Sequence, residues 1–447
     1  MSPAAVPRHA LRIEGTRGLL YDRAAHQYHA LDAAECFALV ENRHRPLHQV
    51  LPVLARACGP ERTALAATRV GELTAIDPAS TLDADLVELE PLDGAAAAPL
   101  VLHLGLTQAC NFSCSHCYSS SGRRANDELS LPELLALVDE LAHIGCLKLV
   151  LGGGEPFLRP ELVEVVGHAR QRGIDCFVHT NGSRLQVEIL SRLAEVQPAG
   201  LAVSLDGPDA ITNDSMRGAG SFDRTLRGLQ LLRRHYAPGF AISFTVTPLN
   251  RSRVGEMVAL AHHEGARVLL LRPAYPAGEA LRDGNALSCD RASFVLAVEQ
   301  ARAAAAGSDL ILDAPHPDER TAPDFEGFGC VAGRIVAGVT PSGVVTPCLN
   351  LPAGHAAGTL REHSLLQLWR EGASFKALRA LQAPDECAHC DRLEICRGGC
   401  RVRALDAHGC IGAADSWCDR LPARPGAGVS ASVRDSGVLN SVEVSTF

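Results

Sequence analysis

Three cysteines, Cys110, Cys114 and Cys117, stand in the spacing CxxxCxxC within the run QACNFSCSHCY. Three thiolates on one short loop can hold three irons of a 4Fe–4S cluster and leave the fourth iron open for a substrate or cofactor. A zinc site would need a fourth ligand. His116 is the candidate for it, but it stands between two of the thiolates and would have to fold back onto the same metal. The spacing favours an iron–sulfur cluster, with zinc as the alternative.

A second group of seven cysteines lies between residues 330 and 418. Its members are Cys330, Cys348, Cys387, Cys390, Cys396, Cys400 and Cys418. The chain has 16 cysteines in total, and in a protein of this length clustered spacing is more typical of metal binding or catalysis than of a disulfide scaffold. A zinc ribbon, which usually contains CxxC pairs, is the alternative to iron–sulfur clusters here.

Short polar motifs follow several apolar runs. They are Gly153-Gly154-Glu155-Pro156, Thr180-Asn181-Gly182, Ser204-Leu205-Asp206-Gly207 and Arg217-Gly218. The first lacks the Lys-Ser/Thr of a P-loop and the GxGxxG of a Rossmann turn, so alone it indicates only a turn. In a parallel sheet the carboxyl ends of the strands share one edge, where ligands bind. We therefore expect these motifs and the first cysteine loop to converge.

The elements that position these motifs are six apolar runs separated by amphipathic helical stretches. The runs are VLHLGLT, LKLVL, IDCFVHT, GLAVSLD, FAISFTVT and RVLLLRP. Strict alternation of strand and helix predicts an α/β fold with a parallel sheet, and right-handed crossovers curl such a sheet. We expect a partial (β/α)6 TIM-like barrel over residues 100–310.

The regions on either side of the barrel have a different pattern. Residues 1–78 contain three short strand-like pieces followed by three helical stretches, the first with Asp32 as N-cap and Glu35 three residues on. This order predicts a winged-helix-like domain. The acidic, Ala-rich stretch 79–99 is expected to be a linker. Residues 320–422 form a Cys-rich domain of short elements, and 423–447 a mobile tail.

Composition limits the classes of function. The 447 residues are 47% hydrophobic and 21% charged, as in a globular enzyme of two or three domains. The formal net charge of −9 gives no basic surplus, so we expect no nucleic acid as a partner. No signal peptide or membrane-spanning run is visible. We expect a cytoplasmic protein with no membrane partner.

The cysteine loop and the strand-end motifs, in this order, resemble the radical SAM family. The resemblance implies that Cys110, Cys114 and Cys117 hold a 4Fe–4S cluster that binds S-adenosyl-L-methionine (SAM). The Gly-Gly-Glu element binds the methionyl amino group in the family, and the region after the fourth strand holds the ribose and carboxylate. The positions concerned are Gly153, Gly154, Glu155, Ser204, Asp206 and Arg217. The implied reaction is reductive cleavage of SAM to a 5′-deoxyadenosyl radical, which abstracts a hydrogen atom from the substrate.

The second cysteine group resembles the SPASM domain, which binds two auxiliary iron–sulfur clusters. By that resemblance Cys387, Cys390, Cys396 and Cys418 hold one cluster, and Cys330, Cys348 and Cys400 hold the other. Fully ligated versions have another Cys just upstream of Cys330, and this chain has none there. The first auxiliary cluster then keeps an open iron or takes Cys289 or Asp324. Leu349 stands where the sulfatase-maturing branch has an Asp, which disfavours oxidation of the sulfatase-maturase type.

Residues 1–78 are similar to the PqqD-like element that binds the leader of a ribosomal peptide. Such modules add the leader as a strand to an exposed sheet edge, here along HQYHAL, or along RGLLYD if that strand is the edge. The resemblance implies a maturase that modifies a leader-bearing precursor peptide, by a thioether or carbon–carbon crosslink or another oxidation. A flavodoxin or ferredoxin would supply electrons.

Two other interpretations stay open. Modification of a tetrapyrrole side chain is suggested by the run GGCRVRA around Cys400, which resembles haem-pathway relatives. A winged-helix regulator that senses redox state through iron–sulfur clusters is the non-enzymatic alternative.

Overall fold

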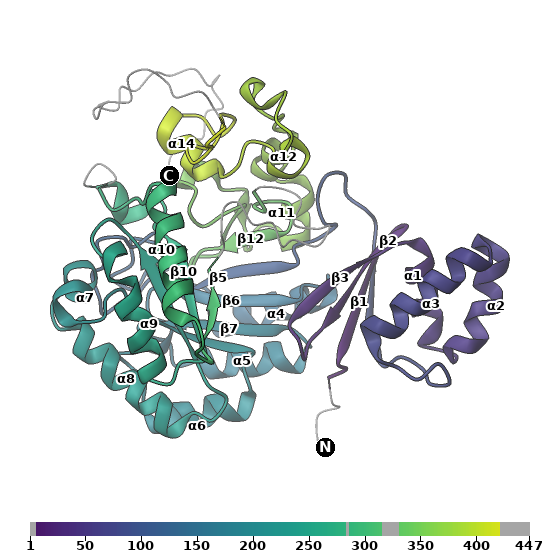
Figure 1. Ribbon diagram of the computed structural model, residues 1–447, viewed down its shortest axis with the longest axis horizontal. Coiled ribbons are helices and arrows are strands. Elements are labelled where there is room, and N and C mark those ends of the chain that lie inside the picture. Colours follow the sequence, from purple (N-terminus) through teal and green to yellow (C-terminus); the bar gives the residue numbers. More distant parts are fainter. Residues whose placement is uncertain (1–5, 283–285, 315–329, 421–447) are drawn as a thin grey trace.

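A computed structural model describes residues 6–282, 286–314 and 330–420. Asp324, the start of the predicted Cys-rich domain and the predicted tail 423–447 lie outside these residues. Within them the chain forms an N-terminal domain, a half-open barrel and a Cys-rich C-terminal part (Figure 1).

The N-terminal domain is a four-stranded sheet packed against three helices. Its elements are β1 (His9–Glu14), β2 (Arg17–Asp22), β3 (Gln27–Leu31), α1 (Ala33–Asn42), α2 (Leu47–Cys58), α3 (Pro60–Thr74) and β4 (Ala84–Leu89). The predicted N-cap of α1 is confirmed, because the Asp32 side chain accepts hydrogen bonds from Ala34 and Glu35 and Glu35 completes the capping box. The strand order is β3-β2-β1-β4, so β3 and β4 are the edges of this sheet.

The prediction that residues 79–99 are a linker is wrong for much of this segment. β4 lies within it and pairs in parallel with β1, from Ala84 opposite His9 onward. The segment continues into the fully buried Ala98, whose carbonyl accepts a hydrogen bond of 2.7 Å from Arg12. The acidic residues that suggested a linker, such as Asp85, are on the exposed side of β4. The composition of this segment therefore does not indicate a strand, because its pairing partner, β1, lies far away in the sequence.

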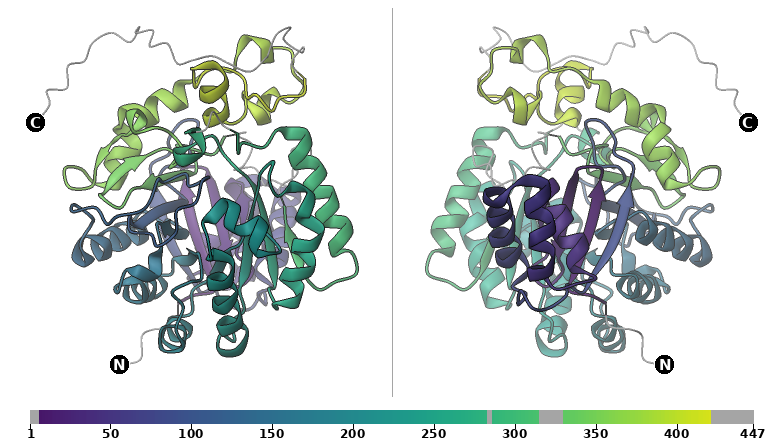
Figure 2. Two further views of the ribbon diagram at one scale, coloured as in Figure 1. Left: turned by 90° about the vertical axis from the view of Figure 1, so that its left-hand side faces the viewer. Right: turned by 90° about the vertical axis from the view of Figure 1, so that its right-hand side faces the viewer.

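The barrel contains the six expected strands, and the predicted partial barrel is confirmed. They are β5 (Val101–Thr107), β6 (Lys148–Gly153), β7 (Asp175–Thr180), β8 (Gly200–Ser204), β9 (Ala241–Val246) and β10 (Val268–Pro273), all parallel and adjacent in chain order. β11 (Ile311–Asp313) continues the sheet beyond β10. The helices that cover its outer face (Figure 2) are α4 (Leu131–His143), α5 (Leu162–Gln171), α6 (Val187–Val196), α7 (Ala210–Arg217), α8 (Ser221–His235), α9 (Val254–His263) and α10 (Arg291–Ala305).

Side chains on each barrel strand alternate between two environments. On β5, Leu102, Leu104 and Leu106 are at most 1% exposed because they pack in the core under the helices. His103, between them, is exposed on the opposite, inner face of the sheet. The outer face therefore holds the barrel together, and the inner face remains accessible to solvent.

The C-terminal part is attached directly to the strand that precedes the first cysteine loop. β12 (Val336–Val339) pairs in parallel with β5, and β13 (Val344–Thr346) and β14 (Gly358–Thr359) extend the same sheet. The remaining helices are α11 (Leu365–Glu371), α12 (Ala373–Ala380), α13 (Leu393–Cys396) and α14 (Arg401–His408). In both views of Figure 2 this part lies above the barrel.

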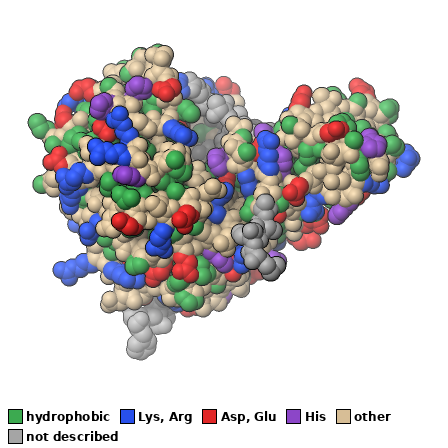
Figure 3. Space-filling model, turned by 90° about the horizontal axis from the view of Figure 1, so that it is seen from below, with side chains coloured by type: hydrophobic (Ala, Val, Ile, Leu, Met, Phe, Trp, Pro, Cys, Tyr) green, Lys and Arg blue, Asp and Glu red, His purple; other side chains and the backbone are tan. Residues whose placement is uncertain are grey.

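The N-terminal domain forms a smaller lobe beside the barrel (Figure 3). Its Tyr21 hydroxyl donates to the Asp175 carboxylate at 2.5 Å, and His26 Nδ1 lies 2.6 Å from the same oxygen. Lys148 Nζ donates to the His26 carbonyl at 3.0 Å. Asp175 and Lys148 begin β7 and β6, so this domain contacts the amino ends of these strands. Among the described residues, no helix has both the length and the apolar character needed to cross a membrane.

Candidate active site

The first cysteine loop begins at the carboxyl end of β5, and its three thiols interact with one another. Burial, with contributions from Asp206 and the Cys117 and Cys110 thiols, raises the pKa of the Cys114 thiol to about 11, while Arg217 opposes these effects. Three thiols this close resist losing three protons, and a bound metal is what stabilises such thiolates. The loop therefore fits a metal cluster.

The Gly-Gly-Glu element lies directly against the backbone that leads into this loop. The Gly154 N–H donates to the Thr107 carbonyl and the Glu155 N–H to the Ala109 carbonyl, both at 2.8 Å. A Cβ on Gly154 would lie 2.0 Å from the Ala109 oxygen, and Gly153 has a φ of 100°. Only glycines allow this approach. The pair of glycines is needed to position the cysteine loop.

The Glu155 carboxylate is directed into the protein, where it joins β6 to β7. One oxygen accepts from the Thr180 hydroxyl at 2.7 Å and the other from the Asn181 N–H at 2.7 Å. The Phe157 N–H donates to the first oxygen at 3.0 Å. Burial raises the pKa of Glu155, and these donors oppose that effect. The side chain thus fixes the loop that follows β7.

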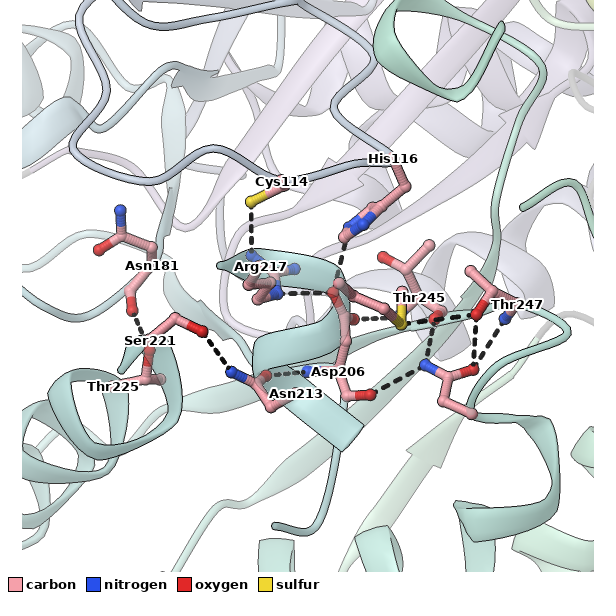
Figure 4. Close-up of polar contacts among 12 residues, drawn as sticks. Cys114, His116, Asn181, Asp206, Asn213, Arg217, Ser221, Thr225, Thr245 and Thr247 are labelled. Atoms are coloured by element: carbon pink, nitrogen blue, oxygen red, sulfur yellow. Dashed lines mark hydrogen bonds and ion pairs between the residues drawn. The ribbon is translucent and has the colours of Figure 1, made fainter. Parts of the chain in front are cut away.

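Asp206, directly after β8, is the centre of a buried ion-pair network (Figure 4). Its Oδ2 lies 2.5 Å from Arg217 Nε and 3.1 Å from His116 Nε2, while the Thr245 N–H donates to Oδ1 at 2.7 Å. The Arg217 guanidinium, with the His116 ring beside it, holds the pKa of Asp206 well below its usual range, against the effect of burial. Asp206 therefore links β8 to β9, to α7 and to the cysteine loop.

His116 does not face the three thiols as a fourth zinc ligand would. Its ring is directed at Asp206, while the Cys114 sulfur lies near Arg217 (Figure 4). Throughout the described ranges, no three side chains of His, Cys, Asp or Glu converge on one metal-ion position. In a 4Fe–4S cluster, by contrast, each thiolate binds a separate iron.

Amide side chains hold the network in place. The Asp206 N–H donates to Asn213 at 2.9 Å, and Asn213 Nδ2 donates to Ser221 at 2.8 Å. Asn250 Nδ2 donates to the Asp206 carbonyl at 2.9 Å. Ser204, the last residue of β8, lies on the inner face opposite Ser243 of β9. It lies two residues before Asp206 in the chain.

The cysteines of the C-terminal part form two groups. Cys390, Cys396 and Cys418 all lie close enough to Cys387 to raise its pKa. Cys330 and Cys400 also lie close to Cys348, and together with burial they raise its pKa to about 12. These groups have the same members as the sets of four and three that the resemblance to the SPASM domain implies, and the ligand assignment stays a prediction. Cys289, the alternative ligand, lies at the N-terminus of α10 beside Asp290, and its carbonyl accepts from Trp417 Nε1 at 3.1 Å.

The sequence motifs did not predict that three basic side chains come together on the inner face of the sheet. His103 on β5, His179 on β7 and Arg272 on β10 interact electrostatically, and burial together with the other two lowers the pKa of His179 to about 4. Arg272 also donates to Asp313 at 2.8 Å. The signal was present, because each stands at an inward position of an otherwise apolar strand.

Two regions of the chain match models of known protein families. Residues 104–261 match the radical SAM superfamily, and residues 330–391 match an iron–sulfur cluster-binding (SPASM) domain. The mycofactocin maturase MftC of Mycobacterium tuberculosis is 32% identical over 318 residues, which cover 70% of this chain and 81% of that protein. An AdoMet-dependent heme synthase of Methanosarcina barkeri is 30% identical over 346 residues, which cover 73% of this chain and 98% of that protein.

Among solved structures, Streptococcus suis SuiB bound to SAM shares the fold. Its TM-score is 0.73 at 17% identity, and the match covers 93% of this chain and 100% of SuiB. Coverage this high includes much of the N-terminal domain. SuiB has also been solved bound to its precursor peptide SuiA, with a TM-score of 0.72. By its domain matches and its curated relatives, the chain belongs to the radical SAM superfamily and carries a SPASM iron–sulfur domain.

Proposed function

We propose that this chain is a radical SAM maturase that oxidatively modifies a leader-bearing ribosomal precursor peptide, by forming a thioether or carbon–carbon crosslink. The observation that carries the proposal is the convergence of the Cys110–Cys117 loop, the Gly-Gly-Glu element and the Asp206–Arg217 pair at one edge of the parallel sheet. The similarity to a curated peptide maturase over 70% of the chain supports the peptide as substrate.

The residues have distinct roles in this proposal. Cys110, Cys114 and Cys117 hold the cluster that binds SAM. When bound, the cluster and SAM supply one-electron cleavage of the sulfonium and removal of a hydrogen atom from the substrate. Because the Glu155 carboxylate is occupied by Thr180 and Asn181, the methionyl ammonium is held by backbone of the Gly-Gly-Glu element.

Other groups complete the cofactor sites. Arg217 would take the SAM carboxylate and Ser204 the ribose, while Asp206 orients Arg217. The two C-terminal cysteine sets would hold auxiliary clusters, which would supply a route for the electron that the substrate loses. A flavodoxin or ferredoxin in the cytoplasm supplies the electron that starts the reaction.

The N-terminal domain is the proposed leader-binding module. β2 is paired on both sides, so the alternative that RGLLYD is the free edge is wrong, and of the two candidate strands only β3 lies at an edge of the sheet. Beside the end of β3, a groove of about 480 Å³ runs between α1 and α3. It is lined by Asp32, Glu35, Arg69 and the 60% exposed Leu65, among others. An edge strand next to a groove supplies both backbone hydrogen bonds and a side-chain pocket.

The modified part of the peptide must reach the opposite end of the barrel. The N-terminal domain contacts the amino ends of β6 and β7, while the cysteine loop follows the carboxyl end of β5. β6 has six residues and spans about 20 Å, so at least about six extended residues of the peptide are needed to cover the length of the barrel strands.

Modification of a tetrapyrrole side chain is the second candidate. The observation that favours it is the similarity to a heme synthase over 98% of that protein. The N-terminal domain, with its open strand edge, is an addition that tetrapyrrole chemistry does not require. Leu349 lies against β12, where a Cβ on Gly338 would be 2.7 Å from its Cγ. No carboxylate is therefore available at this position for sulfatase-type oxidation.

The test compares the two substrates directly. Protein reconstituted without oxygen is reduced and given SAM with a candidate precursor peptide from a short reading frame beside its gene, or with a propionate-bearing porphyrin. We expect a peptide product lighter by a pair of hydrogen atoms and an unchanged porphyrin. Conversion of the porphyrin with an unchanged peptide would reverse the assignment, and absence of SAM cleavage would support the regulator.

A further inference from the structure

Arg217 lies between the cysteine loop and a buried carboxylate. It is the last residue of α7 and is 7% exposed. Its Nε lies 2.5 Å from Asp206 Oδ2, and its Nη1 donates toward Cys114 Sγ at 4.0 Å. The guanidinium thus contacts the carboxylate with one side and a cluster thiolate with the other.

The charges of this pair are fixed. A guanidinium keeps its proton in a protein, and the Asp206 carboxylate lies beside it, so the pair places one positive and one negative charge next to Cys114. The pair is oriented by other contacts, because His116 and the Thr245 N–H also bind the Asp206 carboxylate. The charges beside Cys114 therefore have fixed positions and little water around them.

Fixed charges next to a cluster ligand change how readily the cluster accepts an electron. Reduction adds one negative charge to the cluster, so a nearby cation favours reduction and a nearby anion opposes it. Hydrogen bonds to cluster sulfurs also shift the reduction potential. Both effects are larger in a buried site than in water.

We propose that the Arg217–Asp206 pair sets the reduction potential of the cluster held by Cys110, Cys114 and Cys117. Arg217 raises this potential through Cys114, and Asp206 lowers it while holding Arg217 in place. The step concerned is the addition of one electron from the donor to the cluster, with no bond formed or broken. The role is compatible with a SAM carboxylate contact, because a guanidinium has five N–H donors. The inference rests on the cluster assignment and not on the identity of the substrate.

The test is a redox titration followed by electron paramagnetic resonance, on reconstituted protein without SAM. A variant with all three loop cysteines replaced by Ala, titrated in parallel, supplies the auxiliary-cluster signal to be subtracted. Arg217→Met removes the cation, and Asp206→Asn removes the anion at almost constant size. We expect Arg217→Met to lower the midpoint potential and Asp206→Asn to raise it, each by about tenfold in the reduced-to-oxidised ratio, which is about 59 mV for one electron.

Two further variants separate this role from a merely structural one. Arg217→Lys keeps the positive charge, so we expect its midpoint potential to lack most of the shift expected for Arg217→Met. Arg224→Met is the matched control, since Arg224 stacks on Phe112 of the same loop, 4.5 Å from its ring centre. Shifts of the same sign in Arg217→Met and Asp206→Asn, or no shift in Asp206→Asn with a fully assembled cluster, would overturn the proposal. If Arg217→Met fails to assemble its cluster, the sign of the Asp206→Asn shift alone decides.

Discussion

The absence of a Cβ at Gly154 allows the Gly-Gly-Glu element to lie against the cysteine loop. A Cβ there would lie 2.0 Å from the Ala109 carbonyl oxygen, and this carbonyl is backbone that cannot turn aside. The same oxygen accepts the Glu155 N–H. Any side chain must therefore push the two loops apart at the point where the first cluster ligand begins.

We expect Gly154→Ala to lose the SAM-binding cluster and keep the auxiliary ones, so that iron content falls by about a third. Gly122→Ala is the matched control, because Gly122 lies in the same loop with no atom within 4 Å of its Cβ position. Iron analysis and SAM cleavage assays measure both. Full cleavage activity in Gly154→Ala would contradict this account of the glycine.

We expect the first cysteine loop to be required for SAM cleavage and the C-terminal cysteines to be required for product formation. Replacing Cys110, Cys114 and Cys117 with Ala should abolish reductive cleavage of SAM, because the open iron belongs to that cluster. Replacing Cys387 and Cys390 should spare part of the cleavage while product formation is lost. The measurement is 5′-deoxyadenosine and product in parallel. Equal loss of cleavage in both variants, with both folded, would be evidence against the division.

His179 should make the protein sensitive to acid. Its pKa is about 4 in the folded protein against an ordinary value of 6.5. Between these values the unfolded chain binds a proton that the folded chain does not, so stability falls as the pH is lowered through this window. The loss at pH 5 is at most about 2 kcal/mol, and smaller because water reaches the inner face.

We therefore expect His179→Gln to lose less thermal stability than the parent protein between about pH 7.5 and about pH 5. His103 and Arg272 face His179 from β5 and β10 and are left unchanged in both proteins. Thermal unfolding at the two pH values measures the difference. Equal losses in the two proteins would show that His179 is not the responsible group.

At the scale of elements, the proposal places the leader at the β3 edge of the N-terminal sheet. Leu65, on α3, is 60% exposed in the groove beside β3. Leu65→Ala keeps the helix, since Ala is the best helix former, and removes apolar contact area. We expect about tenfold weaker binding of a labelled leader peptide, measured by fluorescence anisotropy.

Leu296→Ala on α10 is the matched control, because Leu296 is 52% exposed and lies on the barrel instead. Its leader affinity should equal that of the parent. If both variants bind the leader equally well, the groove is not the leader site.

Elements with a local signal were predicted, and those that depend on distant partners were not. The six barrel strands and the Asp32 N-cap follow from alternation and capping within a few residues. β4 was missed because its strand character comes from pairing with β1. The ion pair of Asp206 with His116 was also invisible, since no local pattern relates a residue after β8 to one after β5. β12, β13 and β14 are too short for a periodic signal.

At the scale of the whole molecule, the N-terminal domain and barrel are not independent units. Arg12 and Glu14 of β1 bind backbone at Ala98 and Ala97, and Tyr21 binds Asp175 of the barrel. Deletion of residues 1–78 would strip β4 of its partner and leave Asp175 buried without Tyr21. Point substitutions in the intact chain are therefore the appropriate tests of leader binding.

In the whole molecule, the proposed leader-binding domain and the proposed cluster site lie at opposite ends of the barrel strands. The N-terminal domain contacts their amino ends, and the cysteine loop and Asp206 network lie at their carboxyl ends. A precursor peptide bound at both places would lie along the solvent-accessible inner face. The central claim is that a hydrogen atom leaves this peptide and is transferred to the fragment of SAM.

The most direct measurement is the transfer of that atom. Precursor peptide made with fully deuterated amino acids is incubated with reconstituted enzyme, reductant and SAM, and the 5′-deoxyadenosine is analysed by mass spectrometry. The account predicts that 5′-deoxyadenosine gains one deuterium per modified peptide. Unlabelled 5′-deoxyadenosine together with unchanged peptide would contradict the claim that this enzyme acts on the precursor.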